Sequence, residues 1–236
     1  MARGRLFVGT SGFSYKEWKP DFYPKELKNA EMLRYYAERL PSVEINNTFY
    51  RMPGEGLLRG WMEETPESFA FTLKAPQRIT HFAKLANTEE LLEYFLSTAA
   101  VLGNKLGAIL FQCPPSLRYR GELLDDFLGA LPRNGMRFAM EFRHPSWDEG
   151  GAEQKLAARA VAWCTVDGEG ESPRLVETAD FVYLRLRKSA YDETELAQWG
   201  GKVGAVLDRG TDAYVYFKHE DDPSGVRYAL RLREMC

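Results

Sequence analysis

The residues best suited to chemistry in this sequence stand at the ends of short apolar runs. Glutamate lies near the end of two such runs, SVEIN (42–46) and RFAMEFR (137–143), and lysine ends a third, FTLK (71–74). Carboxylates and amines held close together transfer protons or bind anions, and a set of carboxylates suits Mg²⁺ or Mn²⁺. Whether these groups act together depends on the elements that position them.

Eight apolar runs have the length and composition of β-strands, and helical patterns lie between most of them. The predicted strands cover residues 6–10, 42–46, 69–74, 108–112, 137–142, 161–166, 181–186 and 213–217. Strands that alternate with helices pair in parallel through right-handed crossovers. The sequence therefore predicts one α/β domain over residues 1–236, a (β/α)8 TIM-type barrel, with a doubly wound open sheet as the alternative.

The segment 167–180 (DGEGESPRLVETAD) has no helical stripe of apolar residues. We therefore expect the sixth crossover to lack a regular helix.

Side chains alternate between the two faces of a strand, so each predicted strand divides into an apolar and a polar face. Val43 and Ile45, for example, share one face, while Glu44 and Asn46 share the other. In a barrel the polar face points inward and reaches the rim where the strands end. The predicted rim residues are Ser11, Glu44, Asn46, Lys74, Gln112, Glu141, Arg143, Asp167, Arg185 and Lys218.

These positions suggest roles for individual residues. Glu141 is the leading candidate for a general acid or base, and Lys74 for a base or an anion-neutralising group. We assign catalytic roles to Glu141, Glu44, Lys74 and Asp167. We assign substrate-binding roles to Ser11, Tyr15, Asn46, Tyr50, Gln112, Arg143, His144, Trp147 and Arg185.

Each assignment has a structural alternative. Glu141 would serve stability alone if it paired with Arg143 or Arg185, and the charged rim would then be a plug of salt bridges. Tyr15 and Trp147 would be ordinary core residues covering the barrel mouth.

Overall composition narrows the classes of protein. Lys plus Arg number 31 against 34 for Asp plus Glu, a formal net charge of −3, which predicts no general attraction to nucleic acid or anionic membranes. No signal peptide or membrane-length apolar run is present. Three cysteines without metal-ligand spacing indicate a reduced, cytoplasmic protein.

Cofactors are not predicted by any motif. The three histidines show no paired spacing for zinc, and no Gly-x-Ser-x-Gly elbow is present for a serine hydrolase. No cofactor is therefore expected, although Glu44, Glu141 and Asp167 are residue types that could form a Mg²⁺ or Mn²⁺ site.

Several longer phrases resemble the domain-of-unknown-function 72 family, also called YecE-like. They include VGTSGFSYKEW (8–18), VEINNTFYRMP (43–53), LGxxLFQxPPS (106–116) and EFRHPSW (141–147), and the resemblance spans nearly the whole chain. It implies a TIM-type barrel and no established activity. The chain departs from the family pattern after its last two strands, with Arg187 in place of a histidine and Lys218 in place of an asparagine.

The function predicted from these residues is an enzyme that binds a small polar metabolite, carbohydrate-like or anionic, and acts by acid–base chemistry. Two alternatives stay open: a metal-assisted nucleic-acid-processing protein, by analogy of fold alone, and a ligand-binding or sensor barrel without turnover.

Overall fold

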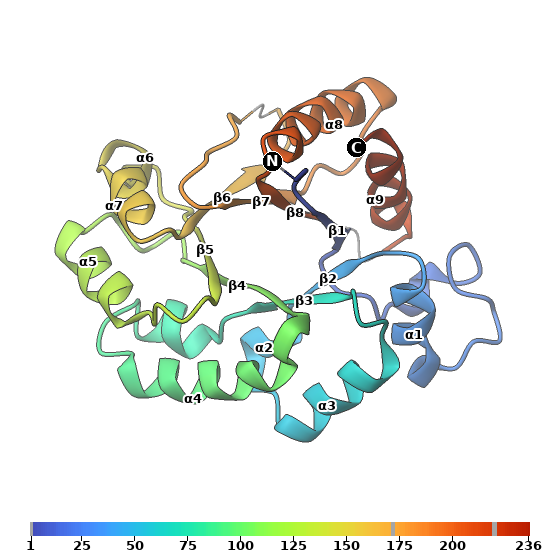
Figure 1. Ribbon diagram of the computed structural model, residues 1–236, viewed down its shortest axis with the longest axis horizontal. Coiled ribbons are helices and arrows are strands. Elements are labelled where there is room, and N and C mark those ends of the chain that lie inside the picture. Colours follow the sequence, from blue (N-terminus) through green and yellow to red (C-terminus); the bar gives the residue numbers. More distant parts are fainter. Residues whose placement is uncertain (1, 171–172, 219–220) are drawn as a thin grey trace.

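Eight parallel strands surround a central axis, and helices lie around them (Figure 1). The computed structural model describes residues 2–170, 173–218 and 221–236. The strands are β1 (Leu6–Thr10), β2 (Ser42–Ile45), β3 (Ala70–Lys74), β4 (Leu106–Gln112), β5 (Arg137–Glu141), β6 (Ala162–Asp167), β7 (Phe181–Leu186) and β8 (Asp212–Phe217). Each predicted strand is confirmed, with ends that differ by at most two residues.

The hydrogen-bonded strand order is β1-β8-β7-β6-β5-β4-β3-β2, which confirms a TIM-type barrel. The helices are α1 (Met32–Ala37), α2 (Asn47–Tyr50), α3 (Glu55–Glu64), α4 (Glu89–Ala99), α5 (Gly121–Ala130), α6 (Ser146–Glu149), α7 (Ala152–Ala158), α8 (Glu193–Asp208) and α9 (Ser224–Met235), with a single π-helical turn at Arg78–Phe82. No helix in the described ranges is long and apolar enough to cross a membrane.

The sixth crossover, between β6 and β7, contains no helix in its described residues 168–170 and 173–180. Figure 1 shows the described residues of this crossover as irregular chain between β6 and β7. The predicted irregularity is therefore confirmed for that part of the chain.

Buried apolar residues form two layers, one between strands and helices and one inside the barrel. The inner layer follows the predicted alternation. Alanines from β3 to β6 face large rings from β1, β7 and β8, which fill the space that the alanines leave. These inner residues are Ala70, Ala108, Ala139 and Ala162 on one side and Phe7, Phe181, Tyr183, Tyr214 and Tyr216 on the other.

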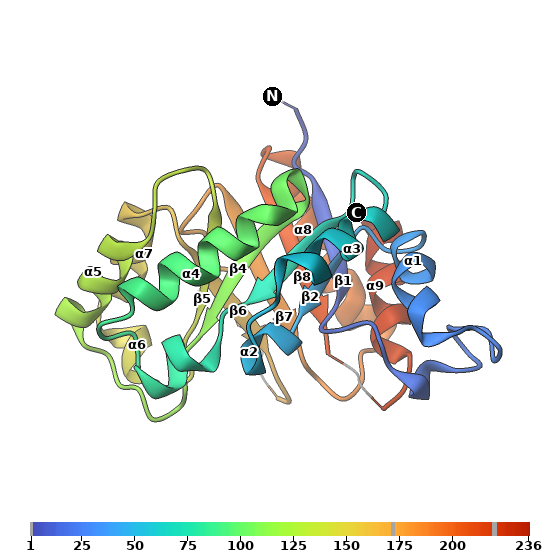
Figure 2. The same ribbon diagram turned by 90° about the horizontal axis from the view of Figure 1, so that it is seen from below.

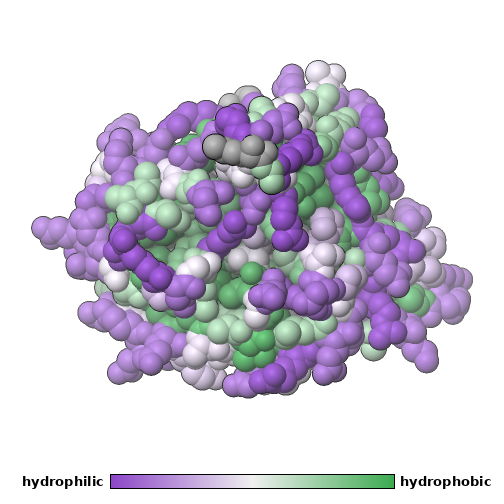
Figure 3. Space-filling view, in the orientation of Figure 1, coloured by the Kyte–Doolittle hydropathy of each residue, from purple (hydrophilic) through white to green (hydrophobic). Residues whose placement is uncertain are grey.

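The two ends of the barrel differ. Figure 2 shows the chain start at one end and the loops that follow the strands at the other. Figure 3 looks onto the end where the strands begin, where apolar surface in the centre is surrounded by hydrophilic residues. The polar residues singled out in the sequence lie at the opposite end, which we call the mouth.

Closure between β1 and β2 depends on few main-chain contacts. A single bridge joins Ser11 to Glu44, and Gly9 lies against the Ser42 carbonyl, where a Cβ would approach that oxygen to 1.9 Å. The Tyr216 hydroxyl, on β8, reaches across β1 to the Ser42 hydroxyl at 2.6 Å and the Thr72 hydroxyl at 2.7 Å. A buried side-chain network therefore reinforces the weakest seam of the barrel.

Tyr216→Phe should lower the free energy of unfolding by about 1–3 kcal/mol, because it removes two buried hydrogen bonds and leaves two hydroxyls with one partner fewer. Chemical denaturation measures this value, and Tyr94→Phe, on the exposed face of α4, is the control. Equal effects of the two substitutions would contradict a role for Tyr216 in closing the barrel.

Candidate functional site

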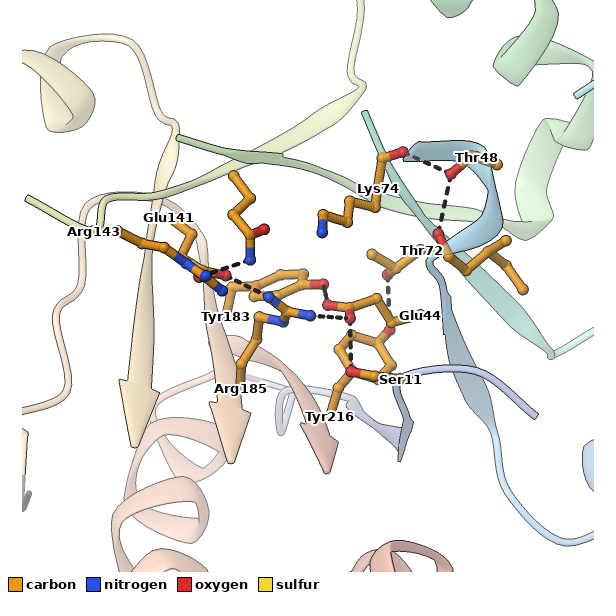
Figure 4. A network of polar contacts seen from close by, with 12 residues as sticks. Ser11, Glu44, Thr48, Thr72, Lys74, Glu141, Arg143, Tyr183, Arg185 and Tyr216 are labelled. Carbon is orange, nitrogen blue, oxygen red and sulfur yellow. Dashed lines mark hydrogen bonds and ion pairs between the residues drawn. The ribbon is translucent and has the colours of Figure 1, made fainter. Parts of the chain in front are cut away.

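Arg185 occupies the centre of the mouth and binds two carboxylates at once (Figure 4). Its Nη2 lies 2.8 Å from Glu44 Oε1, and its Nη1 lies 2.6 Å from Glu141 Oε2. All three side chains are buried. Because β7 ends between β2 and β5 across the barrel, one guanidinium joins strands that do not touch each other.

The remaining carboxylate positions are also occupied. Glu44 accepts hydrogen bonds from the Ser11 hydroxyl at 2.7 Å and from the Tyr183 hydroxyl at 2.6 Å. Glu141 accepts from Gln112 Nε2 and Arg143 Nε, both at 2.8 Å. Each of the four carboxylate oxygens therefore has at least one donor, and both carboxylates are held in a fixed orientation.

This arrangement determines the charge of Glu141. Burial by itself raises the pKa of its carboxyl group, but Arg185 and then Arg143 outweigh that effect and hold the pKa at about 2. Glu141 is therefore an anion throughout the physiological range. A carboxylate held this firmly is a poor acid and a weak base, so its geometry fits the ion-pair alternative for this residue.

Lys74 has the opposite character. Its side chain is only 9% exposed, and its ammonium lies 3.9 Å from the centre of the Phe49 ring, with no carboxylate within ion-pair distance among the residues described. Burial, followed by the positive charge of Arg185, lowers the pKa of Lys74 to about 8. A lysine whose pKa is lowered toward neutral pH suits proton transfer.

Arg187 is a second cation for which the described residues provide no partner. Its guanidinium makes no hydrogen bond and no ion pair in the described parts of the chain, and burial, followed by Arg185, lowers its pKa. It lines a pocket of about 400 Å³ beyond the ends of β7 and β8, together with two lysines, Lys188 and Lys218, and three carboxylates, Glu169, Asp221 and Asp222.

The charges of the mouth do not balance. Four cations, namely Lys74, Arg143, Arg185 and Arg187, act on the same two carboxylates, Glu44 and Glu141. Among these six described side chains two positive charges are therefore in excess in a partly buried space, and unpaired buried charge is costly. His81 lies beside this cluster with its pKa lowered by burial and then by Lys74.

Asp167 does not join the cluster, contrary to the prediction from strand alternation. Cys164 and Val166 face the barrel interior, so Asp167 points outward to α8. Its Oδ2 accepts a hydrogen bond from Trp199 Nε1 at 3.0 Å, and Lys188 Nζ lies 3.8 Å from Oδ1. Burial raises the pKa of this carboxyl group.

Asn46 and Tyr15 lie to one side of the cluster. β2 ends at Ile45 and the backbone turns helical at Asn46, which takes its side chain off the inward face that Glu44 occupies. Both residues line a pocket of about 300 Å³ beside Trp61, and Asn46 Oδ1 is buried without a hydrogen bond in the described structure.

The other aromatic and histidine candidates are separate from the ion pairs. Tyr50 is 74% exposed on α2. Trp147 is buried, donates to the Leu117 carbonyl at 2.7 Å and stacks on Phe142 at 4.0 Å, which fits a core residue. His144 accepts a hydrogen bond from the Ser146 amide at 3.1 Å and lines a different pocket, beyond β5.

Two residues of the mouth were missing from the sequence-based set. Tyr183 shares the inward face with Arg185, and Arg187 lies two residues further along the same direction. Strand alternation places both side chains on the inward face. Tyr183 was left out because an inward aromatic ring is typical of the barrel core, and Arg187 because it follows the predicted end of the strand. His219 and Glu220, which follow Lys218, lie outside the described residues.

The three carboxylates considered for Mg²⁺ or Mn²⁺ do not fit such a site. Asp167 points away from Glu44 and Glu141, whose oxygens bind arginine, tyrosine, serine and glutamine donors. Within the described ranges, no group of three or more His, Cys, Asp or Glu residues is placed to hold a metal ion.

Comparison with known proteins gives the family. A model of the protein of unknown function DUF72 matches residues 7–236. The chain belongs to the DUF72 family. The crystal structure of a DUF72 protein from Thermotoga maritima has a TM-score of 0.87 and 26% identity, with 98% of each chain covered. A DUF72 protein from Enterococcus faecalis shares the fold, with a TM-score of 0.79, 20% identity and coverage of 99% of this chain and 98% of the other.

Curated DUF72 relatives are similarly distant in sequence. UPF0759 protein YunF of Bacillus subtilis is 28% identical over 98% of this chain and 94% of its own length. UPF0759 protein YecE of Escherichia coli K12 is 28% identical over 66% of this chain, and that match spans about half of YecE, 55% of its length. None of these names states an activity.

Glu141→Gln should lower the free energy of unfolding at pH 7 by about 3 kcal/mol, because it removes half of the negative charge that compensates Arg185. A folded-state pKa below its ordinary value stabilises the protein above pH 4.5, and this contribution disappears as the pH falls from 4.5 to about 2. The difference in free energy of unfolding between wild type and variant should therefore become smaller as the pH falls over that range.

Denaturant titrations at several pH values measure this difference, with Glu93→Gln on the exposed side of α4 as the control. A difference in free energy of unfolding that stays constant down to pH 2 would mean that the Glu141 carboxylate does not stabilise the fold.

Lys74→Met should raise the free energy of unfolding at pH 7, by up to about 3 kcal/mol, because it removes a buried charge whose pKa is lowered from 10.5 to about 8. The unfolded lysine holds its proton more tightly, so wild-type stability should rise from pH 8 to pH 10.5 and the variant should lack this rise.

Lys202→Met is the matched control, because Lys202 also lies over an aromatic ring, Trp199, at 4.4 Å, but outside the barrel. Destabilisation by Lys74→Met at pH 7 would show that Lys74 contributes to the fold rather than straining it.

Proposed function

We propose that the mouth of the barrel binds a small anionic metabolite, carrying a carboxylate or phosphate group, and that the protein is an enzyme acting on it by proton transfer through Lys74. The observation that carries the proposal is a pair of cations, Lys74 and Arg187, for which the described residues provide no carboxylate partner. Both are close enough to the Glu44–Arg185–Glu141 ion pairs to interact with them electrostatically. An anion bound beside these cations offsets the positive charge that the described residues leave uncompensated.

The ion pairs supply the rigid part of this site. Arg185 and Arg143 each donate a hydrogen bond to Glu141, which fixes the planes of their guanidinium groups. Arg185 Nε is buried and has no acceptor among the described residues. Preorganised donors of this kind bind an oxyanion without first having to reorganise. Glu44 and Glu141 therefore orient the cations and take no part in proton transfer.

Lys74 supplies the chemistry. With a pKa of about 8, a fraction of it is a neutral amine at pH 7 and accepts a proton, while the ammonium form donates one to a developing oxyanion. A bound anion favours the ammonium and raises the pKa of Lys74, so binding and protonation are coupled. Unpaired cysteines at positions 113, 164 and 236 support a reduced, cytoplasmic setting as part of the same proposal.

Titration with inorganic phosphate, citrate and acetate, followed by calorimetry at low and moderate salt, tests the binding part. Wild type should bind at least one of them, and Lys74→Met or Arg187→Met should each weaken binding by about tenfold or more, the loss expected for a charged hydrogen bond. Lys202→Met should leave the affinity unchanged.

Incubation with mixed anionic metabolites, read by mass spectrometry, tests the enzyme part. Depletion of one compound by wild type and not by Lys74→Met is the expected result. Anion binding that is unchanged in both Lys74→Met and Arg187→Met would refute the anion site. Anion binding by wild type without depletion of any metabolite would indicate a ligand-binding barrel and not an enzyme.

A further inference from the structure

A crevice opens beside the mouth where β5 and β6 separate. These strands are paired at only two positions, Ala139 with Ala162 and Met140 with Trp163, whereas β4 and β5 stay paired as far as Gln112 and Glu141. No helix in the described part of the sixth crossover covers the opening. The result is a pocket of about 520 Å³.

The crevice is continuous with the cluster in the mouth. Arg143 lines it and also donates its Nε to Glu141. Cys164 and Val166 form part of its wall and face the barrel interior, and Glu141 is near enough to Cys164 to help raise the pKa of its thiol, after burial. Arg143 is therefore the cation that a ligand in the crevice and a ligand in the mouth could share.

The crevice wall combines an aromatic surface with N–H donors. The Trp163 ring is half-buried and lies 5.0 Å from the Phe142 ring, and its Nε1 donates to no acceptor in the described chain. His144 accepts the Ser146 amide through Nδ1, so in the neutral ring the proton resides on Nε2. Such a wall suits a flat ring with acceptor atoms at its edge.

We propose that the β5–β6 crevice binds a planar ring, which makes the substrate class an aromatic or heteroaromatic carboxylate or phosphate. This inference rests on the proposed anion site, which holds the charged group, and adds Trp163 as the residue that determines specificity for the ring. The irregular backbone of the described residues 168–170 and 173–180 is then a requirement of the ligand, because a regular helix packed on β6 would occupy the ring's position.

Methyl phosphate and phenyl phosphate separate the two proposals, since they carry the same charged group. Wild type should bind phenyl phosphate about tenfold more tightly than methyl phosphate, an increment typical of a ring buried against aromatic side chains. Trp163→Leu should abolish this ratio without changing the affinity for methyl phosphate. Trp163→Phe, which preserves a ring and the fold, should retain most of it.

Two controls fix the location of the ring. Trp61→Leu alters another half-buried tryptophan that does not line the crevice, and Tyr50→Ala removes an exposed ring on α2 that does not line it either. Both should preserve the ratio. The crevice inference would be overturned if wild type bound the two esters equally. It would also be overturned if Trp163→Leu kept the preference for phenyl phosphate while a control variant lost it. Either result would leave the anion site intact. Binding of neither ester would overturn both.

Discussion

The sharing of one guanidinium between two buried carboxylates determines how the mouth of this barrel is built. Arg185 on β7 binds Glu44 on β2 and Glu141 on β5, so three strands from separate parts of the ring converge on a single group. Removing charges from water is costly, and each partner is tolerable only while the others are present. The positions of Ser11, Gln112, Tyr183 and Arg143 follow from the need to satisfy the remaining carboxylate oxygens.

This network explains why the remaining cations matter. A plug built only for stability would end with balanced charge, and apolar residues of the same volume would serve it as well or better. Here Lys74 and Arg187 add positive charge to a cluster that Arg143 and Arg185 already neutralise. Uncompensated charge that is partly buried tends to accumulate at functional sites, because binding or catalysis repays its cost.

Strand alternation predicted most of the mouth from the sequence, because parallel strands in a barrel share one inward direction. The rule succeeded for Glu44, Glu141 and Arg185, which lie within regular strands. It failed for Asn46, where the backbone leaves the strand, and for Asp167, where the inward face of β6 belongs to Cys164 and Val166. Which carboxylate pairs with which cation, and hence the low pKa of Glu141, depends on distances across the barrel that no local pattern contains.

The electrostatics of Glu141 differ from what its residue type alone suggests. A glutamate at a strand end is the usual first choice for acid–base chemistry, yet two arginines commit Glu141 to the charged form. Burial, followed by the positive charge of Arg185, lowers the pKa of Lys74, since both disfavour its ammonium. The same arginine therefore moves the pKa of a carboxyl group away from neutrality and contributes to moving the pKa of an amine toward it.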